Sequence, residues 1–144
     1  MIKKNIVILL SVLYLNMISC SERNLRESLD GIQSNTIQPS INDTCLSYGV
    51  HDFEVRTKGR GWMIDNVDAT DSFISLNGDF KNQQIFPYII DNEWFVIERT
   101  DQTLLKISVE ANTMSYERFF RVCLFDRNYY AYITIRQKTK DIHP

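Results

Sequence analysis

The sequence predicts an all-β fold, namely an immunoglobulin-like antiparallel β-sandwich of about seven to eight strands. The chain holds seven Tyr, eight Phe and two Trp, nearly all of them from Tyr48 onward, and aromatic residues favour strands. After Thr44 no helical period is sustained over about ten residues, whereas short apolar runs recur at a spacing of roughly ten residues between turn residues. A small β-barrel is the alternative arrangement of the same strands.

The first 19 residues predict a cleaved bacterial lipoprotein signal peptide. Lys3 and Lys4 precede an almost wholly apolar run over residues 6–18, which is too short to span a bilayer. The run ends in residues 17–20, Met-Ile-Ser-Cys, where the small residue before cysteine suits lipidation and methionine replaces the usual leucine. We therefore expect lipidation of Cys20 and attachment to the outer membrane, facing either the periplasm or the cell exterior. A plain signal peptide with an incidental Cys20 is the alternative.

Residues 20–44 are rich in Ser, Asn, Asp and Gln, and their few apolar residues keep no sustained period. This composition predicts a flexible tether. Removal of residues 1–19 takes away two of the 16 basic residues, so that 14 remain against 18 acidic ones and the net charge is −4. A mildly acidic surface of mixed sign argues against nucleic-acid partners.

The predicted strands begin with the alternating residues 53–56, which a glycine-containing turn over residues 58–61 separates from a second run, residues 62–67. Residues 73–76 end at Asn77-Gly78, a dipeptide typical of a two-residue type I′ hairpin turn. The run over residues 85–90 contains Pro87, which has no amide hydrogen to donate, so it predicts an edge strand or an irregular segment.

The C-terminal strands show the clearest alternation. Residues 94–98, 104–110, 118–125 and 129–137 are each strand-like, and residues 126–128, Asp-Arg-Asn, predict a tight turn between the last two. One face of each of the last three strands is apolar, which predicts burial on one side of a sheet. The predicted sandwich therefore covers residues 45–138, with a short tail at residues 139–144. The inward-facing residues are expected to be Leu105, Ile107, Val109, Phe120, Val122, Leu124, Ala131, Ile133 and Ile135.

Cys45 and Cys123 remain once Cys20 is lipidated. In an oxidising compartment they can pair in one way only, as a Cys45–Cys123 disulfide. The alternative is that Cys123, inside an alternating apolar strand, is a buried free thiol.

A series of landmarks follows in a fixed order along residues 48–138. The sequence has Thr-Lys-Gly-Arg-Gly-Trp at residues 57–62, Trp94, Leu-Lys-Ile-Ser-Val-Glu-Ala-Asn at residues 105–112, Glu-Arg at 117–118 and Ile-Thr-Ile-Arg-Gln at 133–137. In this order the chain resembles the BACON domain, a Bacteroidetes-associated module, most specifically over residues 94–137. It departs from the family in the long spacing between Trp62 and Trp94, which implies an extra hairpin around Asn77-Gly78, and in lacking a glycine after Gln137. The resemblance implies an immunoglobulin-like sandwich on an envelope lipoprotein, with a carbohydrate-binding role inferred from the proteins that carry such domains.

The residues themselves provide no catalytic constellation. The two histidines, His51 and His143, with Cys45 and Cys123 do not supply the closely spaced ligands of a zinc site. Asp65, Asp68 and Asp71 lie three apart, not in the spacing of a calcium loop, and are expected in a solvated turn. We expect no enzyme activity, metal or cofactor.

Aromatic side chains are the candidates for sugar contact, because sugars dock their apolar faces on exposed rings. Tyr130 and Tyr132 share one face of the final strand and are predicted to point outward. Trp62 and Trp94 have core packing as an alternative, since such sandwiches commonly bury a tryptophan. The candidate residues are Tyr130, Tyr132, Tyr88, Trp62 and Trp94.

The sequence therefore predicts a lipid-anchored, non-catalytic binding module of the cell envelope, with polysaccharide as the candidate ligand. An alternative is a structural spacer or assembly component that contacts an envelope protein by strand addition, either near Pro87 or at the final strand. A hydrolase is a third, weaker alternative.

Overall fold

The computed structural model describes residues 37–141. The predicted signal peptide, Cys20 and most of the predicted tether lie outside the described residues. Within residues 37–141, no helix has both the length and the apolar character needed to cross a membrane.

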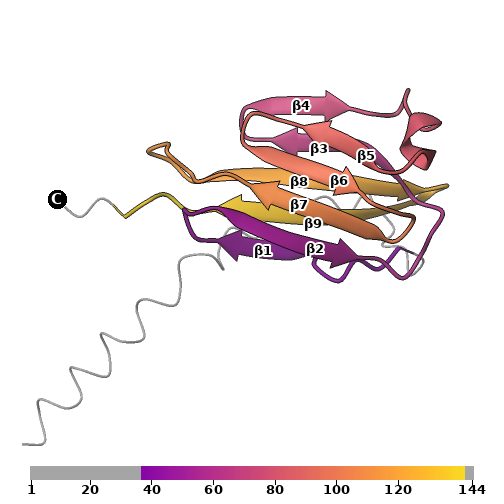
Figure 1. The fold of residues 1–144 in the computed structure, drawn as a ribbon, viewed down its shortest axis with the longest axis horizontal. Helices are drawn as coiled ribbons and strands as arrows, with labels where there is room; N and C mark the ends of the chain where they lie inside the picture. The colour runs from indigo at the N-terminus through magenta and orange to yellow at the C-terminus, as the bar shows by residue number, and fades with distance from the viewer. Residues whose placement is uncertain (1–36, 142–144) are drawn as a thin grey trace, which may run out of the picture. The chain divides into compact units, whose positions relative to one another are not determined.

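The described residues form nine strands in two sheets, which pack face to face as the predicted sandwich (Figure 1). The five-stranded sheet has the order β1-β9-β8-β3-β4, and the four-stranded sheet has the order β2-β7-β6-β5. A short 3-10 helix, η2 (Asn82–Gln84), lies between β4 and β5. The strands are β1 (Asp43–Leu46), β2 (His51–Arg56), β3 (Met63–Ala69), β4 (Ser72–Ser75), β5 (Tyr88–Asp91), β6 (Phe95–Arg99), β7 (Leu104–Val109), β8 (Arg118–Asp126) and β9 (Tyr129–Gln137).

The core between the sheets comes from the alternation in the sequence. In the long β8–β9 hairpin Val122 is opposite Ile133 and Phe120 is opposite Ile135, and all four side chains are buried. β7 contributes Leu105, Ile107 and Val109 from the other sheet. The predicted inward faces of these strands are confirmed, because side chains two apart lie on the same side of a strand.

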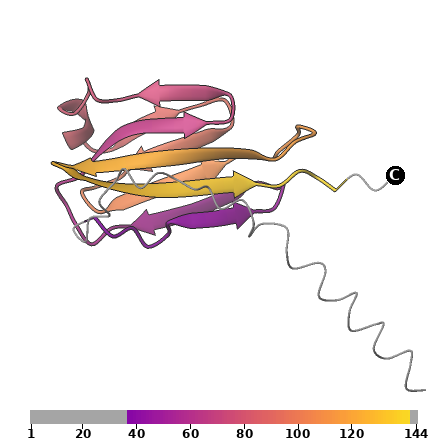
Figure 2. The same ribbon diagram turned by 180° about the vertical axis from the view of Figure 1, so that it is seen from behind.

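β1 is the one strand that pairs in parallel, with β9 (Figure 2). The sandwich begins earlier than the sequence indicates, because Ile37 is fully buried in the core and Pro39 forms a bridge with Thr57. The Ser40 amide also donates to the Arg56 carbonyl. The predicted tether over residues 20–44 is therefore wrong from Ile37 onward, since this apolar side chain and these backbone contacts attach the segment to β2.

Asn77-Gly78 does not form the predicted hairpin. Neither residue has a positive φ, and the chain after β4 enters η2 and crosses to β5 in the other sheet. The β3–β4 hairpin instead turns at Thr70-Asp71, while the predicted Asp126-Arg127-Asn128 turn is present with Arg127 at φ 58°. The prediction failed because no alternating apolar strand follows Gly78 that could pair with β4.

β5 is an edge strand as predicted from Pro87, and it pairs with β6 alone. β9, by contrast, is an interior strand between β1 and β8. The final strand therefore offers no free edge for strand addition, because β1 occupies the position beside it.

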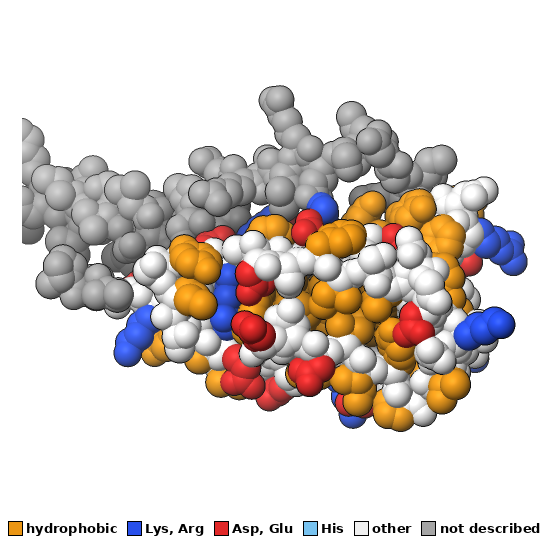
Figure 3. Space-filling view, turned by 90° about the horizontal axis from the view of Figure 1, so that it is seen from above, with side chains coloured by type: hydrophobic (Ala, Val, Ile, Leu, Met, Phe, Trp, Pro, Cys, Tyr) orange, Lys and Arg blue, Asp and Glu red, His pale blue; other side chains and the backbone are white. Residues whose placement is uncertain are grey.

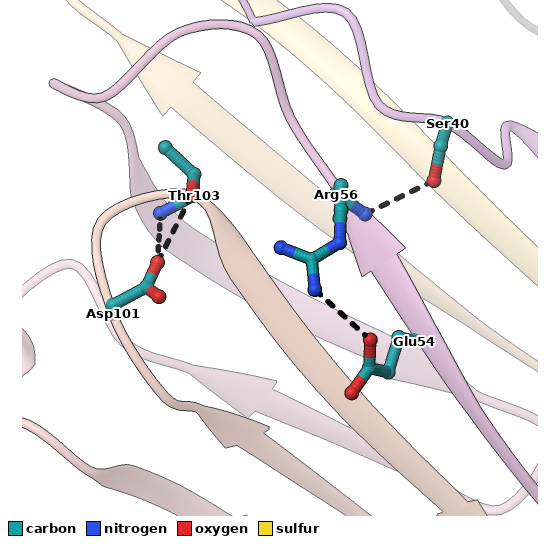
Figure 4. A network of polar contacts seen from close by, with 5 residues as sticks. All are labelled: Ser40, Glu54, Arg56, Asp101 and Thr103. Atoms are coloured by element: carbon teal, nitrogen blue, oxygen red, sulfur yellow. Dashed lines mark hydrogen bonds and ion pairs between the residues drawn. The ribbon is translucent and has the colours of Figure 1, made fainter.

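Polar contacts hold the surface beside β2 and the β6–β7 turn (Figure 4). The Ser40 hydroxyl accepts from the Arg56 amide at 3.0 Å, and the Arg56 guanidinium donates to Glu54 at 3.3 Å. Across the turn, Asp101 accepts from the Thr103 amide at 2.6 Å, which holds the pKa of Asp101 below its usual value. These groups are largely solvated and serve to fix the turn and the entry of the chain.

Candidate functional site

Two arginines pack on the two tryptophans, one pair at each end of the sandwich. The Arg99 guanidinium carbon lies 4.1 Å from the Trp62 ring centre, and that of Arg118 lies 4.2 Å from the Trp94 ring centre. All four side chains are buried. Each pair places a cation on an aromatic face, which is a favourable contact when it is desolvated.

The Trp62 end is filled by its own side chains. Trp62 is 0% exposed and donates its indole N–H to the Thr57 hydroxyl at 2.7 Å, while Arg99 donates to the Trp62 carbonyl at 2.6 Å and the Gln83 carbonyl at 3.1 Å. Burial lowers the pKa of Arg99 to about 10. Trp62 therefore has no surface for a sugar, and its predicted role as a binding residue is wrong because the core takes the whole ring.

At the other end, four residues of the BACON-like pattern belong to one connected network. Arg118 donates its Nε to the Gln137 side chain at 2.9 Å and its Nη2 to the Glu110 carbonyl at 2.7 Å. The Gln137 amide nitrogen donates to the carbonyls of Gly49 and Glu110 at 2.8 and 3.0 Å. Trp94 joins the network through the guanidinium stacked on its ring.

Asn112 connects the loop between β7 and β8 to this network. Its side-chain nitrogen donates to the carbonyl of Tyr116 at 3.0 Å and to those of Gln137 and Lys138, and its oxygen accepts from the Met114 amide at 3.0 Å. The order of these residues along the sequence thus corresponds to contacts in space. Their effect is to fix the loop that carries Met114 and Tyr116.

A pocket of about 270 Å³ opens at this end of the sandwich. The β3–β4 turn lines it with Thr70 and Asp71, and the segment between β5 and β6 lines it with Glu93 and Trp94. The segment from β7 to β8 adds Glu110, Ala111, Thr113, Met114, Tyr116 and Arg118. In Figure 3, acidic side chains gather beside a basic one toward the left, the end of these turns in Figure 1.

Trp94 forms the inner wall of the pocket and is not an open platform. It is 6% exposed, packs edge-on against Phe95 and Phe120, and donates its indole N–H to Asp71 at 3.3 Å. Tyr116, at 49% exposed, is the aromatic side chain of this site that solvent reaches. Burial lowers the pKa of Arg118, and the charge of Asp71 opposes that shift.

The predicted tyrosines lie elsewhere. Tyr130 is half-buried with its ring centre 5.2 Å from that of Phe125, and Tyr132 is exposed with Arg121 over its ring at 5.3 Å. Both lie on the outer face of the five-stranded sheet, as the alternation predicts. Tyr88 donates its hydroxyl to Asp79 at 2.7 Å, and burial together with this bond raises its pKa to about 12. The structure therefore does not gather the five predicted residues into one site.

The cysteine alternatives can be compared with the described residues. Cys123 is a free buried thiol, so the predicted Cys45–Cys123 disulfide is wrong; burial raises the pKa of Cys123 to about 11. No three His, Cys, Asp or Glu side chains of residues 37–141 gather closely enough to hold a metal ion. Asp65 and Asp68 lie within β3, not in a turn as expected, because the hairpin turns at Asp71 instead.

The residue pattern did not identify Tyr116, Met114 and Arg118 as lining residues of a site. A signal was present, because residues 113–117 lie between two landmarks of the BACON-like pattern, Asn112 and Arg118, in a loop between strands. Loops held by a rigid scaffold commonly carry binding residues.

Comparison with known proteins finds solved structures of similar fold. No family model and no curated protein matches the chain. A protein from Bacteroides thetaiotaomicron, solved by NMR, matches with a TM-score of 0.59 at 16% identity, covering 79% of this chain and 95% of that one. A Bacteroides ovatus GH5 xyloglucanase, solved with a XXXG heptasaccharide, matches with a TM-score of 0.43 at 12% identity over 74% of this chain and 19% of its own. The chain is thus similar in fold to a Bacteroides protein over nearly that protein's whole length.

Proposed function

We propose that this chain is a BACON-like, non-catalytic binding module, held to the cell envelope through a lipidated Cys20, that binds a glycan at the pocket beside Trp94. The observation that carries this proposal is the pocket itself, where three carboxylates, one guanidinium and an exposed tyrosine converge at one end of a rigid sandwich. Small-molecule sites commonly combine a concave surface with a few fixed polar groups and aromatic side chains. The volume of about 270 Å³ suits a single sugar unit or a chain end.

The network beneath the pocket supports a binding role more than a catalytic one. Asn112 fixes the backbone at Tyr116, and Gln137 fixes the guanidinium of Arg118, so both groups are held in place before a ligand arrives. Preorganisation of this kind lowers the entropy cost of binding.

A glycan array probed with the purified protein tests the proposal, followed by calorimetry on the strongest ligand. Tyr116→Ala is expected to weaken binding by about two- to tenfold, because a stacked ring is worth roughly 0.5–1.5 kcal/mol. Tyr132→Ala is the matched control, since this exposed tyrosine lies on the outer face of the five-stranded sheet. Absence of binding to every glycan on the array would refute the glycan proposal. A loss of affinity in Tyr132→Ala alone would place the binding site at β9 instead.

The membrane attachment is tested separately by cell fractionation. Cys20→Ala is expected to move the protein from the membrane fraction to the soluble fraction. Retention of this variant on membranes would contradict lipid anchoring at Cys20.

Strand addition to an envelope protein is the second candidate function, and the edge strand β5 favours it. Ile89 is 55% exposed on β5, and Phe73 is 65% exposed on β4, the edge strand of the other sheet. Crosslinking in cells through a photoreactive residue at position 89 tests this function, with Asp52 of β2 as the control position. Partner capture at both positions alike would argue against use of this edge.

A further inference from the structure

The pocket beside Trp94 holds more negative than positive charge. Asp71, Glu93 and Glu110 supply three carboxylates, while Arg118 supplies the single cation among its lining residues. Asp71 accepts the Trp94 indole N–H and the Ser72 hydroxyl, but the carboxylates of Glu93 and Glu110 form no hydrogen bond or ion pair with the rest of residues 37–141. Two exposed acceptors are thus uncommitted at the pocket.

Arg118 adds a donor to the same pocket. Its Nε and Nη2 are used by Gln137 and the Glu110 carbonyl, and its guanidinium rests on Trp94. Its Nη1 makes no hydrogen bond within the described part of the chain, although the side chain is only 6% exposed and lines the pocket. Among the described residues, Arg99 Nε is the only buried side-chain polar atom without a partner, so Arg118 Nη1 reaches solvent and can donate to a ligand oxygen.

We infer that the pocket takes an uncharged, hydroxyl-bearing sugar unit and rejects acidic sugars; this inference rests on the proposed glycan function. A hydroxyl group both accepts and donates, so one sugar can take a hydrogen bond from Arg118 and give others to Glu93 and Glu110. A uronic acid or sulfated unit brings a further negative charge to a pocket whose lining already carries a net charge of −2, one cation against three carboxylates. Like charges at such short separation repel, and the effect weakens with added salt.

The test uses matched pairs of sugars on the glycan array. Each neutral hexose oligomer is placed beside the uronic acid oligomer of the same stereochemistry and length, and the strongest pair is measured by calorimetry at low and high ionic strength. The neutral member is expected to bind about tenfold more tightly at low ionic strength, and this ratio is expected to fall as salt is added.

Charge-neutralising variants locate the origin of the preference. Glu93→Gln combined with Glu110→Gln keeps the side-chain shape, and we expect it to reduce the ratio to about threefold or less, because two of the repelling charges are gone. Glu54→Gln is the control, since Glu54 lies on β2 beside Arg56, outside the pocket, and should leave the ratio unchanged.

The outcomes separate this inference from the function on which it rests. Array hits among acidic glycans, equal affinity for both members of a pair, or a ratio unchanged in the double variant would overturn the charge inference while leaving a glycan-binding module. Absence of any hit would overturn the glycan function and the inference together.

Discussion

Replacing Gln137 with methionine tests whether the network under the pocket stabilises the fold. Gln137 is 0% exposed, and methionine has a similar volume but no polar amide. The substitution removes the acceptor of Arg118 Nε and the donor to the Gly49 carbonyl, whereas the Glu110 carbonyl keeps its bond from Arg118 Nη2.

Two groups are thereby left without partners, and each such buried group costs about 1–3 kcal/mol. Because Gly49 lies in a loop where water can partly replace the lost bond, we expect a total near the lower end, about 2–4 kcal/mol. The measurement is the free energy of unfolding of the purified protein in urea.

Gln84→Met is the matched control, because Gln84 is an exposed glutamine at the end of η2. This control should change the free energy of unfolding by about 0.5 kcal/mol or less. A loss at Gln137 no larger than that at Gln84 would refute the view that the network holds this end of the sandwich together.

Three further predictions concern other parts of the molecule. Arg99→Lys should lower the free energy of unfolding by about 2 kcal/mol or more, because an ammonium group cannot both stack flat on Trp62 and donate to two carbonyls. Thermal unfolding measures this loss, with Arg60→Lys at an exposed arginine as the control. Burial raises the pKa of Cys123 from 9.0 to about 11, so its neutral thiol contributes stability below pH 9.0 that is lost as the pH rises to about 11. Cys123→Ala should remove this part of the pH dependence of the free energy of unfolding, measured in urea. Curves of unfolding free energy against pH that run parallel for the two proteins would contradict this prediction. Glu54→Gln should change the free energy of unfolding by about 0.5 kcal/mol or less, because both side chains of the Glu54–Arg56 ion pair are exposed. A larger change in urea unfolding would contradict the view that this exposed pair adds little stability.

The strands that the sequence predicts best are those whose burial alternates. Ile107, Val122 and Ile133 each occupy the centre of an alternating run, and the physical cause of the pattern, one face in the core, is local to each strand. β1 could not be found this way, because its residues Asp43–Leu46 are at most partly buried and its partner β9 lies about ninety positions later in the chain. Pairing at that distance leaves no local pattern.

The candidate site was even harder to predict from the sequence than β1. The order of Trp94, Asn112, Arg118 and Gln137 was visible in the sequence, and each has a local explanation as a turn or strand-end residue. Several of their hydrogen bonds join positions 25 to 89 residues apart, so only the fold brings these groups together. The pocket itself follows from three separate turns meeting at one end, which periodicity cannot reveal.

The first described residue and the pocket lie at opposite ends of the sandwich. Ile37 lies beside Lys58 and Gly59, whose amides donate to its carbonyl at 3.1 and 3.4 Å, and this is the Trp62 end of the sandwich. The pocket lies at the Trp94 end, the whole length of the strands away. The contacts that hold Ile37 therefore lie outside the lining of the pocket, so the effects of substitutions at the two ends can be measured independently of each other.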